Sequence, residues 1–234
     1  MPTIVFANPK GGAGKTTSAF ILSTELASRG LSVTVIDADP NHPIYEWSQE
    51  GGRADNLSVI SNNDEELILE DIEKASANSD FVIVDLEGTA NLSVAYAISK
   101  ADLVIVPSQR STLDNKQAAK AIALVKRQSN VANRDIPVAV LLTRTNAAIR
   151  TKGLKRMVES LEINNIITFD TEFHEREAYK AVFDHKCTLA DLNSSQVSGL
   201  EKAMDNASNF AAEAIKKLQT ISLSENTKEV SNVA

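Results

Sequence analysis

The chain has 234 residues and a mass of 25.3 kDa, and its 43% hydrophobic and 24% charged residues are typical of a folded globular protein and exclude a disordered one. Its 24 basic and 31 acidic side chains give a formal net charge of −7, which argues against a surface coated throughout with nucleic acid. The one cysteine, Cys187, excludes an internal disulfide and a multi-cysteine metal site, and it fits a reducing, cytoplasmic compartment. The sequence contains no apolar run of the ~18–20 residues that a membrane span needs, so we expect no membrane partner.

Apolar strands alternate with helical patterns along most of the chain. In chain order, the pattern predicts strands over 3–8, 32–37, 57–61, 81–85, 103–106 and 137–142, and helices over 15–29, 64–77, 91–99 and 113–130. Such alternation is typical of an α/β fold, a mostly parallel twisted sheet with helices on both faces. Ligands of these folds bind at the carboxyl ends of the strands.

The remaining third of the chain is predicted to be mainly helical. Helices are expected over 150–161, 174–185 and 196–220, with a short strand over 165–169. We see no linker or internal repeat, and we therefore expect a single domain over 1–221. The polar tail over 222–234 is expected to be flexible.

A glycine-rich segment between the first strand and the first helix carries the strongest functional signal. It reads Lys10-Gly11-Gly12-Ala13-Gly14-Lys15-Thr16-Thr17. Glycines let backbone N–H groups curl around phosphate oxygens, and the helix N-terminus adds its positive dipole end. Lys15 would then reach the β- and γ-phosphates of a nucleotide, and the Thr16 hydroxyl would bind Mg²⁺. The alternative is a chance glycine-rich turn.

Acidic residues stand at the ends of two predicted strands. Asp37 and Asp39 follow the second strand, and Asp85 ends the strand over 81–85. These acids and the glycine-rich segment all fall at the carboxyl ends of strands, where ligands of such folds bind, although a capped strand end is the alternative for each acid. Tyr45 and Trp47 are expected to pack a helix after Asp39, with a dimer contact as the alternative.

These motifs together resemble those of the ParA/MinD class of P-loop ATPases. Lys10 to Thr17 is similar to their deviant Walker A motif, because Pro9 replaces the usual first glycine and a lysine stands early in the loop. The segments over 37–40 and 81–85 resemble their second acidic motif and their Walker B strand. Residues 173–178 resemble a segment of small ParA-like proteins, which include the Vir-type ATPases of T-DNA transfer.

The resemblance implies a role for each matching residue, with ATP and Mg²⁺ as cofactors. Lys10 matches a signature lysine that crosses an ATP-sandwich homodimer to the partner's phosphates, and Lys15 and Asp39 match the phosphate-binding lysine and the acid that positions the attacking water. The loop from Lys10 to Thr17 would contact the phosphates, and Arg144 would contact adenine. Thr16, Asp37 and Asp85 would surround the metal ion. The chain departs from the family at Asn41, where glutamine is frequent, and in the segment after Asp85, which often carries prolines in the family and reads Leu86-Glu87-Gly88 here.

Basic residues are concentrated in one part of this acidic chain. Residues 115–156 contain ten basic side chains and one acidic side chain, without an aromatic residue. We therefore expect sequence-independent contact with DNA phosphates rather than base stacking, centred on Arg150, Lys152, Lys155 and Arg156. Two solvated helix faces would be the simpler explanation.

The resemblance leaves three functions open. The first is a partition ATPase that dimerises with ATP, binds DNA non-specifically on the nucleoid and is stimulated by a ParB-like adaptor or centromere-binding protein. Its cargo could be a plasmid, a transferred DNA strand or a protein cluster. The second is a MinD-like membrane switch, which the polar end of the chain disfavours. The third is a metabolic or metal-cluster relative, which would need more cysteines.

Overall fold

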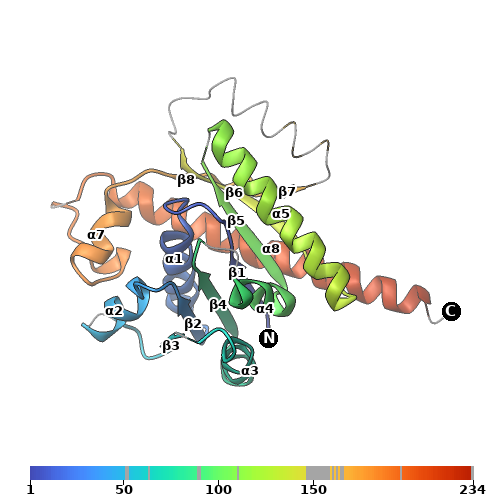
Figure 1. Ribbon diagram of the computed structural model, residues 1–234. Helices are drawn as coiled ribbons and strands as arrows, with labels where there is room; N and C mark the ends of the chain where they lie inside the picture. Colours follow the sequence, from blue (N-terminus) through green and yellow to red (C-terminus); the bar gives the residue numbers. More distant parts are fainter. Residues whose placement is uncertain are drawn as a thin grey trace.

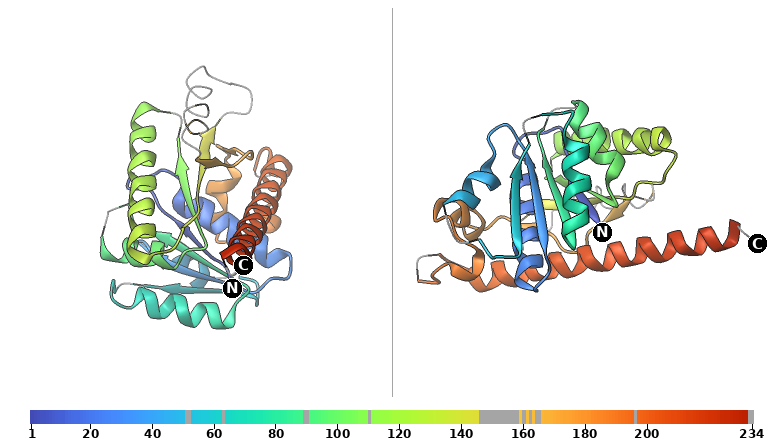
Figure 2. Two further views of the ribbon diagram at one scale, coloured as in Figure 1. Left: turned by 90° about the vertical axis from the view of Figure 1, so that its right-hand side faces the viewer. Right: turned by 90° about the horizontal axis from the view of Figure 1, so that it is seen from below.

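The computed structural model describes residues 1–50, 53–62, 64–88, 91–109, 111–145, 159, 161, 163, 166–195 and 197–232. It contains an eight-stranded sheet with helices on both faces (Figures 1 and 2). The strands are β1 (Thr3–Phe6), β2 (Val33–Ala38), β3 (Leu57–Ser61), β4 (Phe81–Leu86), β5 (Leu103–Ser108), β6 (Val138–Thr145), β7 (Ile167–Thr168) and β8 (Phe173–His174). The helices are α1 (Lys15–Ser28), α2 (Pro43–Gln49), α3 (Ile68–Asn78), α4 (Leu92–Lys100), α5 (Thr112–Ala132), α7 (Ala178–Asp184), the short 3₁₀ helix η1 (Leu189–Asp191) and α8 (Leu200–Asn232).

The strands pair in the order β3-β2-β4-β1-β5-β6-β7. Strand β8 also pairs with β6, nearer the carboxyl end of β6 than β7 does. Every pair is parallel, which confirms the predicted fold class. The register places Asp37 of β2 opposite Asp85 of β4, and Phe6 of β1 opposite the same Asp85. The carboxyl ends of these three strands therefore lie side by side, as the sequence predicted for its acidic residues.

Each central strand is buried on both faces. In β1 and the residue after it, Ile4 and Phe6 belong to one hydrophobic cluster, and Val5 and Ala7 belong to the other. The first cluster includes side chains of α1, α2, α7 and α8, whereas the second includes side chains of α3, α4 and α5. Because both faces are covered, the strands read as continuous apolar runs instead of alternating ones.

Helix α8 is longer than the sequence analysis predicts. Its small and aromatic residues pack against the first cluster, where Ala207, Phe210 and Ala214 are fully buried. The predicted helix over 196–220 is wrong at both ends, because α8 begins at Leu200 and continues to Asn232, past the end of the sheet (Figure 2). No glycine or proline interrupts 200–232, so nothing local ends the helix once its first half has packed.

The predicted helix over 174–185 begins four residues too early. Phe173 and His174 form β8, and helix α7 follows only from Ala178. The Thr145 Oγ1 and His174 Nδ1 atoms hydrogen-bond at 2.6 Å, and the His174 amide donates to Asn206 Oδ1 at 3.2 Å. These tertiary contacts override a helical pattern. The helix predicted over 150–161 lies mostly outside the described residues.

Candidate nucleotide-binding site

The glycine-rich segment forms a loop between the end of β1 and the start of α1. Gly12 and Gly14 adopt positive φ angles of 71° and 102°, which only glycine adopts without strain. A Cβ at Gly14 would lie 3.3 Å from Thr143 Cγ2, so β6 approaches the loop closely there. The Thr143 hydroxyl also donates a hydrogen bond of 2.7 Å to the Ala13 carbonyl oxygen. The loop shape therefore depends on glycine as the sequence predicts.

Two further side chains hold the loop in place. Asn8 donates to the Pro107 carbonyl oxygen at 2.6 Å and accepts from the Lys10 amide at 2.8 Å, so one buried side chain links the loop to β5. Gln109, which follows β5, donates to the Gly12 carbonyl oxygen at 2.7 Å. Sequence analysis missed Asn8, Gln109 and Thr143, because they lie outside the motif or far from it in the chain.

Lys15 begins helix α1 and is 6% exposed. Burial lowers its pKa, while the charges of Asp85, Asp39 and Glu87 act in the opposite direction. The lysine predicted to bind phosphate is thus a buried cation surrounded by acidic groups. A bound polyphosphate would supply the stronger counter-charge that a buried ammonium group favours.

Asp85 is the most unusual carboxylate of the site. It is 0% exposed, and neither of its oxygen atoms accepts a hydrogen bond of good geometry from the described residues. Burial raises its pKa to about 8; the neighbouring Thr16 hydroxyl and the Lys15 charge lower it, and the Asp37 charge raises it further. A buried carboxylate with only the Thr16 hydroxyl as a neighbouring donor fits a site for a hydrated cation.

Magnesium fits this set of residues. Thr16 and Asp85 offer the hydroxyl and carboxylate oxygens that Mg²⁺ favours beside phosphates. Among the described residues, no group of three or more His, Cys, Asp or Glu side chains has the arrangement of a metal site made by protein alone. Mg²⁺ commonly keeps several waters and binds one or two side chains plus substrate phosphates, which agrees with this arrangement.

Asp37 organises the segment that follows β2. Its Oδ2 atom accepts hydrogen bonds from the Ile44 and Tyr45 amides at 2.8 and 3.0 Å, at the start of α2. Burial raises the pKa of Asp37, and these backbone hydrogen bonds oppose that shift. The Asp37 Oδ1 atom accepts a longer hydrogen bond of 3.3 Å from the Asp39 amide. Backbone amides therefore reach both oxygens of Asp37, and its place near the metal ion stays a prediction. Asp39 accepts from the Asn41 amide at 2.9 Å and lies nearer the surface.

Helix α2 connects this segment to the core. Trp47 is fully buried, packs edge-to-face on Phe20 of α1 with ring centroids 4.7 Å apart, and donates from its indole nitrogen to the Cys187 carbonyl oxygen at 3.2 Å. The expectation that Trp47 packs this helix is confirmed. Its complete burial leaves no surface for the alternative dimer contact.

Lys10 forms an ion pair that the sequence did not predict. Its Nζ atom lies 2.6 Å from Asp114 Oδ1, and the Asp114 side chain is 1% exposed. Ser111 caps helix α5, and its hydroxyl donates to Asp114 while the Asp114 amide donates back to that hydroxyl at 3.1 Å. Burial raises the pKa of Asp114, but the hydrogen bonds from Lys10 and Ser111 outweigh it and hold the pKa below its usual value. The Ser-x-x-Asp spacing before a helix is the signal that could have drawn attention to Asp114.

The two remaining groups of predicted residues have different outcomes. Arg144 is exposed near the carboxyl end of β6, with a positive φ of 50°. The glycine-rich loop lies at the same end of the parallel sheet, and the contact of Arg144 with adenine stays a prediction. Arg150, Lys152, Lys155 and Arg156 lie outside the described residues, and their predicted role in DNA binding is likewise untested.

Comparison with known proteins agrees with this loop, these acids and this sheet. The family model of the VirC1 protein matches residues 1–227. The chain belongs to the VirC1 family. It is also 37% identical over 218 residues to the protein ParA of Rhizobium radiobacter, covering 93% of this chain and 98% of that protein.

Two other comparisons agree with this family and with this fold. The chain is 29% identical over 187 residues to the virC1 protein of Rhizobium radiobacter, covering 78% of this chain and 80% of that protein. A solved structure of a variant of McdA from Cyanothece in complex with ATP superimposes with a TM-score of 0.73 at 19% identity, covering 94% of this chain and 96% of that one. The suspected ParA/MinD resemblance is confirmed.

The raised pKa of Asp85 predicts how the stability of this VirC1-family protein depends on pH without nucleotide and metal. Between the ordinary value of 3.8 and about 8, the folded protein keeps a proton on Asp85 that the unfolded chain loses, so stability falls as pH rises through this range. Asp85→Asn removes the titration, and we expect its melting temperature at pH 8 to exceed that of the wild type by about 2–4 °C or more, the shift that ~1 kcal/mol causes in a domain of this size.

The measurement is thermal unfolding in EDTA from pH 5 to pH 8. Asp55→Asn, a change at an exposed carboxylate, serves as the control and should follow the wild type. Parallel pH profiles for the wild type and Asp85→Asn would show that Asp85 is ionised in the folded protein.

Proposed function

We propose that this VirC1-family protein is an ATPase that dimerises with ATP and Mg²⁺, binds DNA without sequence preference and positions a cargo. The observation that carries the proposal is a phosphate loop with two lysines in different environments. Lys15 is buried beside Asp85 and Asp39, whereas Lys10 is 30% exposed at the edge of the loop. A buried lysine suits the phosphates of its own subunit, and a lysine at the rim suits the phosphates of a second one.

Hydrolysis is proposed to require Asp39. A carboxylate that orients the attacking water acts in the transition state rather than in substrate binding, and Asp39 lies close enough to Lys15 to raise that lysine's pKa. Thr16 and Asp85 would hold Mg²⁺, which would neutralise charge on the phosphates. Lys15 and the backbone amides from Gly11 to Thr17 would orient the γ-phosphate.

Substitution of Asp39 tests catalysis separately from binding. Asp39→Ala is expected to lower kcat by about 10²–10⁴-fold and to leave ATP affinity within a few fold, because it removes an interaction of the transition state. Turnover and nucleotide affinity are measured on one preparation, with Asp55→Ala as the control. Unchanged turnover would show that Asp39 only stabilises the segment after β2 and takes no part in hydrolysis.

The ion pair between Lys10 and Asp114 predicts opposite effects on the dimer. Lys10→Ala is expected to prevent the dimer that forms with Mg²⁺ and a slowly hydrolysed ATP analogue. Asp114→Asn is expected to strengthen that dimer by on the order of tenfold, the equivalent of ~1.4 kcal/mol, because Lys10 no longer has to leave an internal partner.

Light scattering over a range of protein concentrations measures both effects, and thermal unfolding verifies that each variant is folded. Lys116→Ala removes an exposed lysine of α5 and serves as the control for Lys10→Ala. Normal dimerisation of Lys10→Ala would contradict a role of this residue across the interface.

DNA contact is proposed for the basic part of the chain, centred on Arg150, Lys152, Lys155 and Arg156. Reversal of Arg150 and Lys152 to glutamate is expected to abolish duplex binding and to leave ATP-dependent dimerisation unchanged. Lys180→Glu with Lys202→Glu makes the same change in net charge at exposed positions of α7 and α8, and should have little effect. A double variant at 150 and 152 that still retains duplex DNA at low salt would place the surface elsewhere.

The cargo and the adaptor follow from the relatives only as proposals. ParA and virC1 relatives favour a DNA cargo, moved in partition or in conjugal transfer, and a ParB-like adaptor that stimulates hydrolysis. A relative named for the maintenance of carboxysome distribution, 26% identical over 180 residues, makes a protein cluster the second candidate. For the membrane alternative, none of the described helices is long and apolar enough to cross a bilayer. Fluorescence microscopy of the tagged protein, with and without the neighbouring genes, would show which cargo it follows.

A further inference from the structure

A groove separates helices α4 and α5 directly beside the phosphate loop. It has a volume of about 390 Å³, and its walls come from both helices, from residues 7–9 at the start of the loop and from Glu87 after β4. We call this hollow the α4/α5 groove. The two helices cover the same face of the sheet as α3, and Figure 1 shows their arrangement.

The walls of the groove are mainly aliphatic. Val94 and Ile98 of α4 and Ala121 and Leu124 of α5 line it, and the first three are at most 5% exposed. Such walls favour aliphatic side chains, whose burial stabilises a complex by about 25 cal/mol per Å² of apolar surface removed from water. A charged phosphate backbone gains nothing from them.

The α5 side of the groove is cationic. Lys120 and Arg127 line it and are exposed, and they lie seven residues apart, on one face of the helix. Within the part of the chain that the structure describes, neither side chain forms a salt bridge or a side-chain hydrogen bond. No acidic residue occurs from 115 to 132, although the whole chain has a net charge of −7. Glu87, at the loop end of the groove, is the one acidic residue among those that line it, so two cations face one carboxylate there. The excess of positive charge on the α5 side favours carboxylates from outside the chain.

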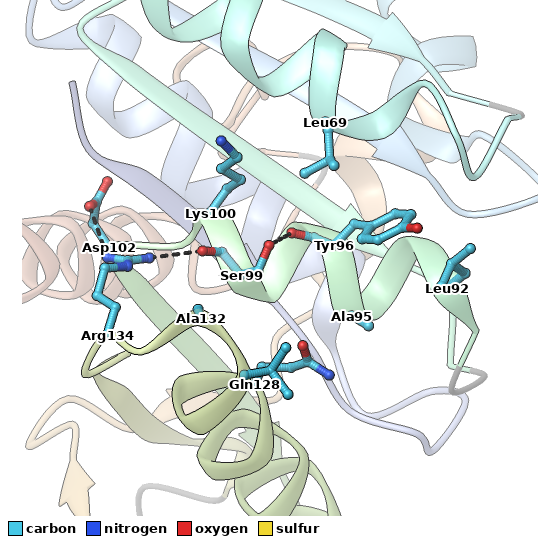
Figure 3. Close-up of a pocket in the computed structure, with 11 residues that line it drawn as sticks. Leu69, Leu92, Ala95, Tyr96, Ser99, Lys100, Asp102, Gln128, Ala132 and Arg134 are labelled. Carbon is cyan, nitrogen blue, oxygen red and sulfur yellow. Dashed lines mark hydrogen bonds and ion pairs between the residues drawn. The ribbon is translucent and has the colours of Figure 1, made fainter.

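A larger hollow between the same two helices lacks this property. It has a volume of about 710 Å³ and is shown in Figure 3. Its charged residues are already paired, because Arg134 lies 3.8 Å from Asp102 and donates to the Ala101 carbonyl oxygen at 2.6 Å, and Lys100 lies 2.8 Å from Glu73. Because these charged side chains already have partners within the chain, they do not favour a charged ligand, in contrast to Lys120 and Arg127 of the α4/α5 groove.

We propose that the α4/α5 groove binds a segment of a partner protein that presents aliphatic side chains on one face and carboxylates beside them. The aliphatic side chains would enter between Ile98 and Leu124, and the carboxylates would pair with Lys120 and Arg127. An amphipathic acidic helix has this chemistry. Duplex DNA matches the cations but not the hollow with its apolar walls, so a protein segment is the better occupant.

The groove is also connected to the phosphate loop. Asn8 and Pro9 line it, and Asn8 accepts a hydrogen bond from the Lys10 amide. A Cβ at Gly88, next to Glu87, would lie 3.3 Å from the Pro9 carbonyl oxygen, so the segment after β4 packs directly on the loop. An occupant would touch both segments, and its affinity should therefore change when nucleotide binds. This step rests on the proposed nucleotide binding, whereas the groove itself does not.

The test uses a fluorescent 15-residue peptide with leucines at helical spacing on one face and glutamates on the other, and the nucleotide-free full chain. Reversing Lys120 and Arg127 together to glutamate is expected to weaken binding at least tenfold. The matched variant, Lys116→Glu with Lys126→Glu, makes the same charge change on α5 outside the groove and should weaken it less than twofold. Equal effects of the two variants, or none, would overturn the proposal.

A second variant separates the hollow from the charge. Ala123 is exposed and lines the groove, so Ala123→Arg fills the space while adding a positive charge. Weaker peptide binding supports insertion into the groove, and tighter binding would show that charge alone is responsible and would overturn it. A 30-base-pair duplex replaces the peptide in a third arm. Loss of duplex binding without loss of peptide binding, on reversal of Lys120 and Arg127, would assign the cations to DNA and overturn the proposal.

A nucleotide arm completes the experiment. Peptide affinity is compared for the free protein, for ADP with Mg²⁺ and for a slowly hydrolysed ATP analogue with Mg²⁺. A change of at least threefold between these states supports coupling, and equal affinities would overturn that part. If the protein binds no nucleotide at all, the proposed function fails, while the peptide results on the nucleotide-free chain still decide the fate of the groove.

Discussion

Charge is buried at the carboxyl end of the sheet, and the rest of the site is arranged around that constraint. Lys15 and Asp85 are almost inaccessible to water, and Asp37 lies opposite Asp85 in the paired strands. Burying such groups without full hydrogen bonding costs free energy, and among the described residues the Asp85 oxygens accept no hydrogen bond of good geometry that would fully offset it. A metal ion and a polyphosphate would supply the missing charges. The tight glycine loop and its tether through Asn8 keep the space for them open.

The two loop lysines differ in their surroundings, because Lys15 is buried in the site and Lys10 lies at its rim. Lys15 is fixed by burial at the start of α1, whereas Lys10 reaches across to Asp114 at the start of α5. This second contact joins α5 to the glycine-rich loop, even though the partner of Lys10 lies 104 residues further along the chain. The same helix carries Lys120 and Arg127 along the groove that also borders the loop. Helix α5 therefore contacts the glycine-rich loop through Asp114 and the α4/α5 groove through Lys120 and Arg127.

The local parts of the site could be predicted from the sequence, and the long-range parts could not. The glycine loop, Lys15 and the acids at strand ends follow from strand and helix patterns over a few residues, and the strand register brought Asp37 and Asp85 together as expected. The partner of Lys10 is 104 residues away, and no short pattern links two such positions. His174 was placed in a helix because Asn206 and Thr145, which hold it in β8, come from distant elements. The length of α8 exceeds the prediction because the polar residues after 220 contain no helix breaker, so the helix continues through them.

The position of Trp47 gives the protein an internal optical signal. It is the one tryptophan of the chain, and it belongs to α2, whose first amides donate to Asp37. Its ring packs on Phe20 of α1, the helix that begins at the glycine-rich loop. A shift of either helix when phosphate or metal binds changes the packing around the indole ring and its hydrogen bond to Cys187. Indole emission depends on such surroundings, so the intrinsic fluorescence of the unlabelled chain reports on occupancy of the site from a position buried in the core.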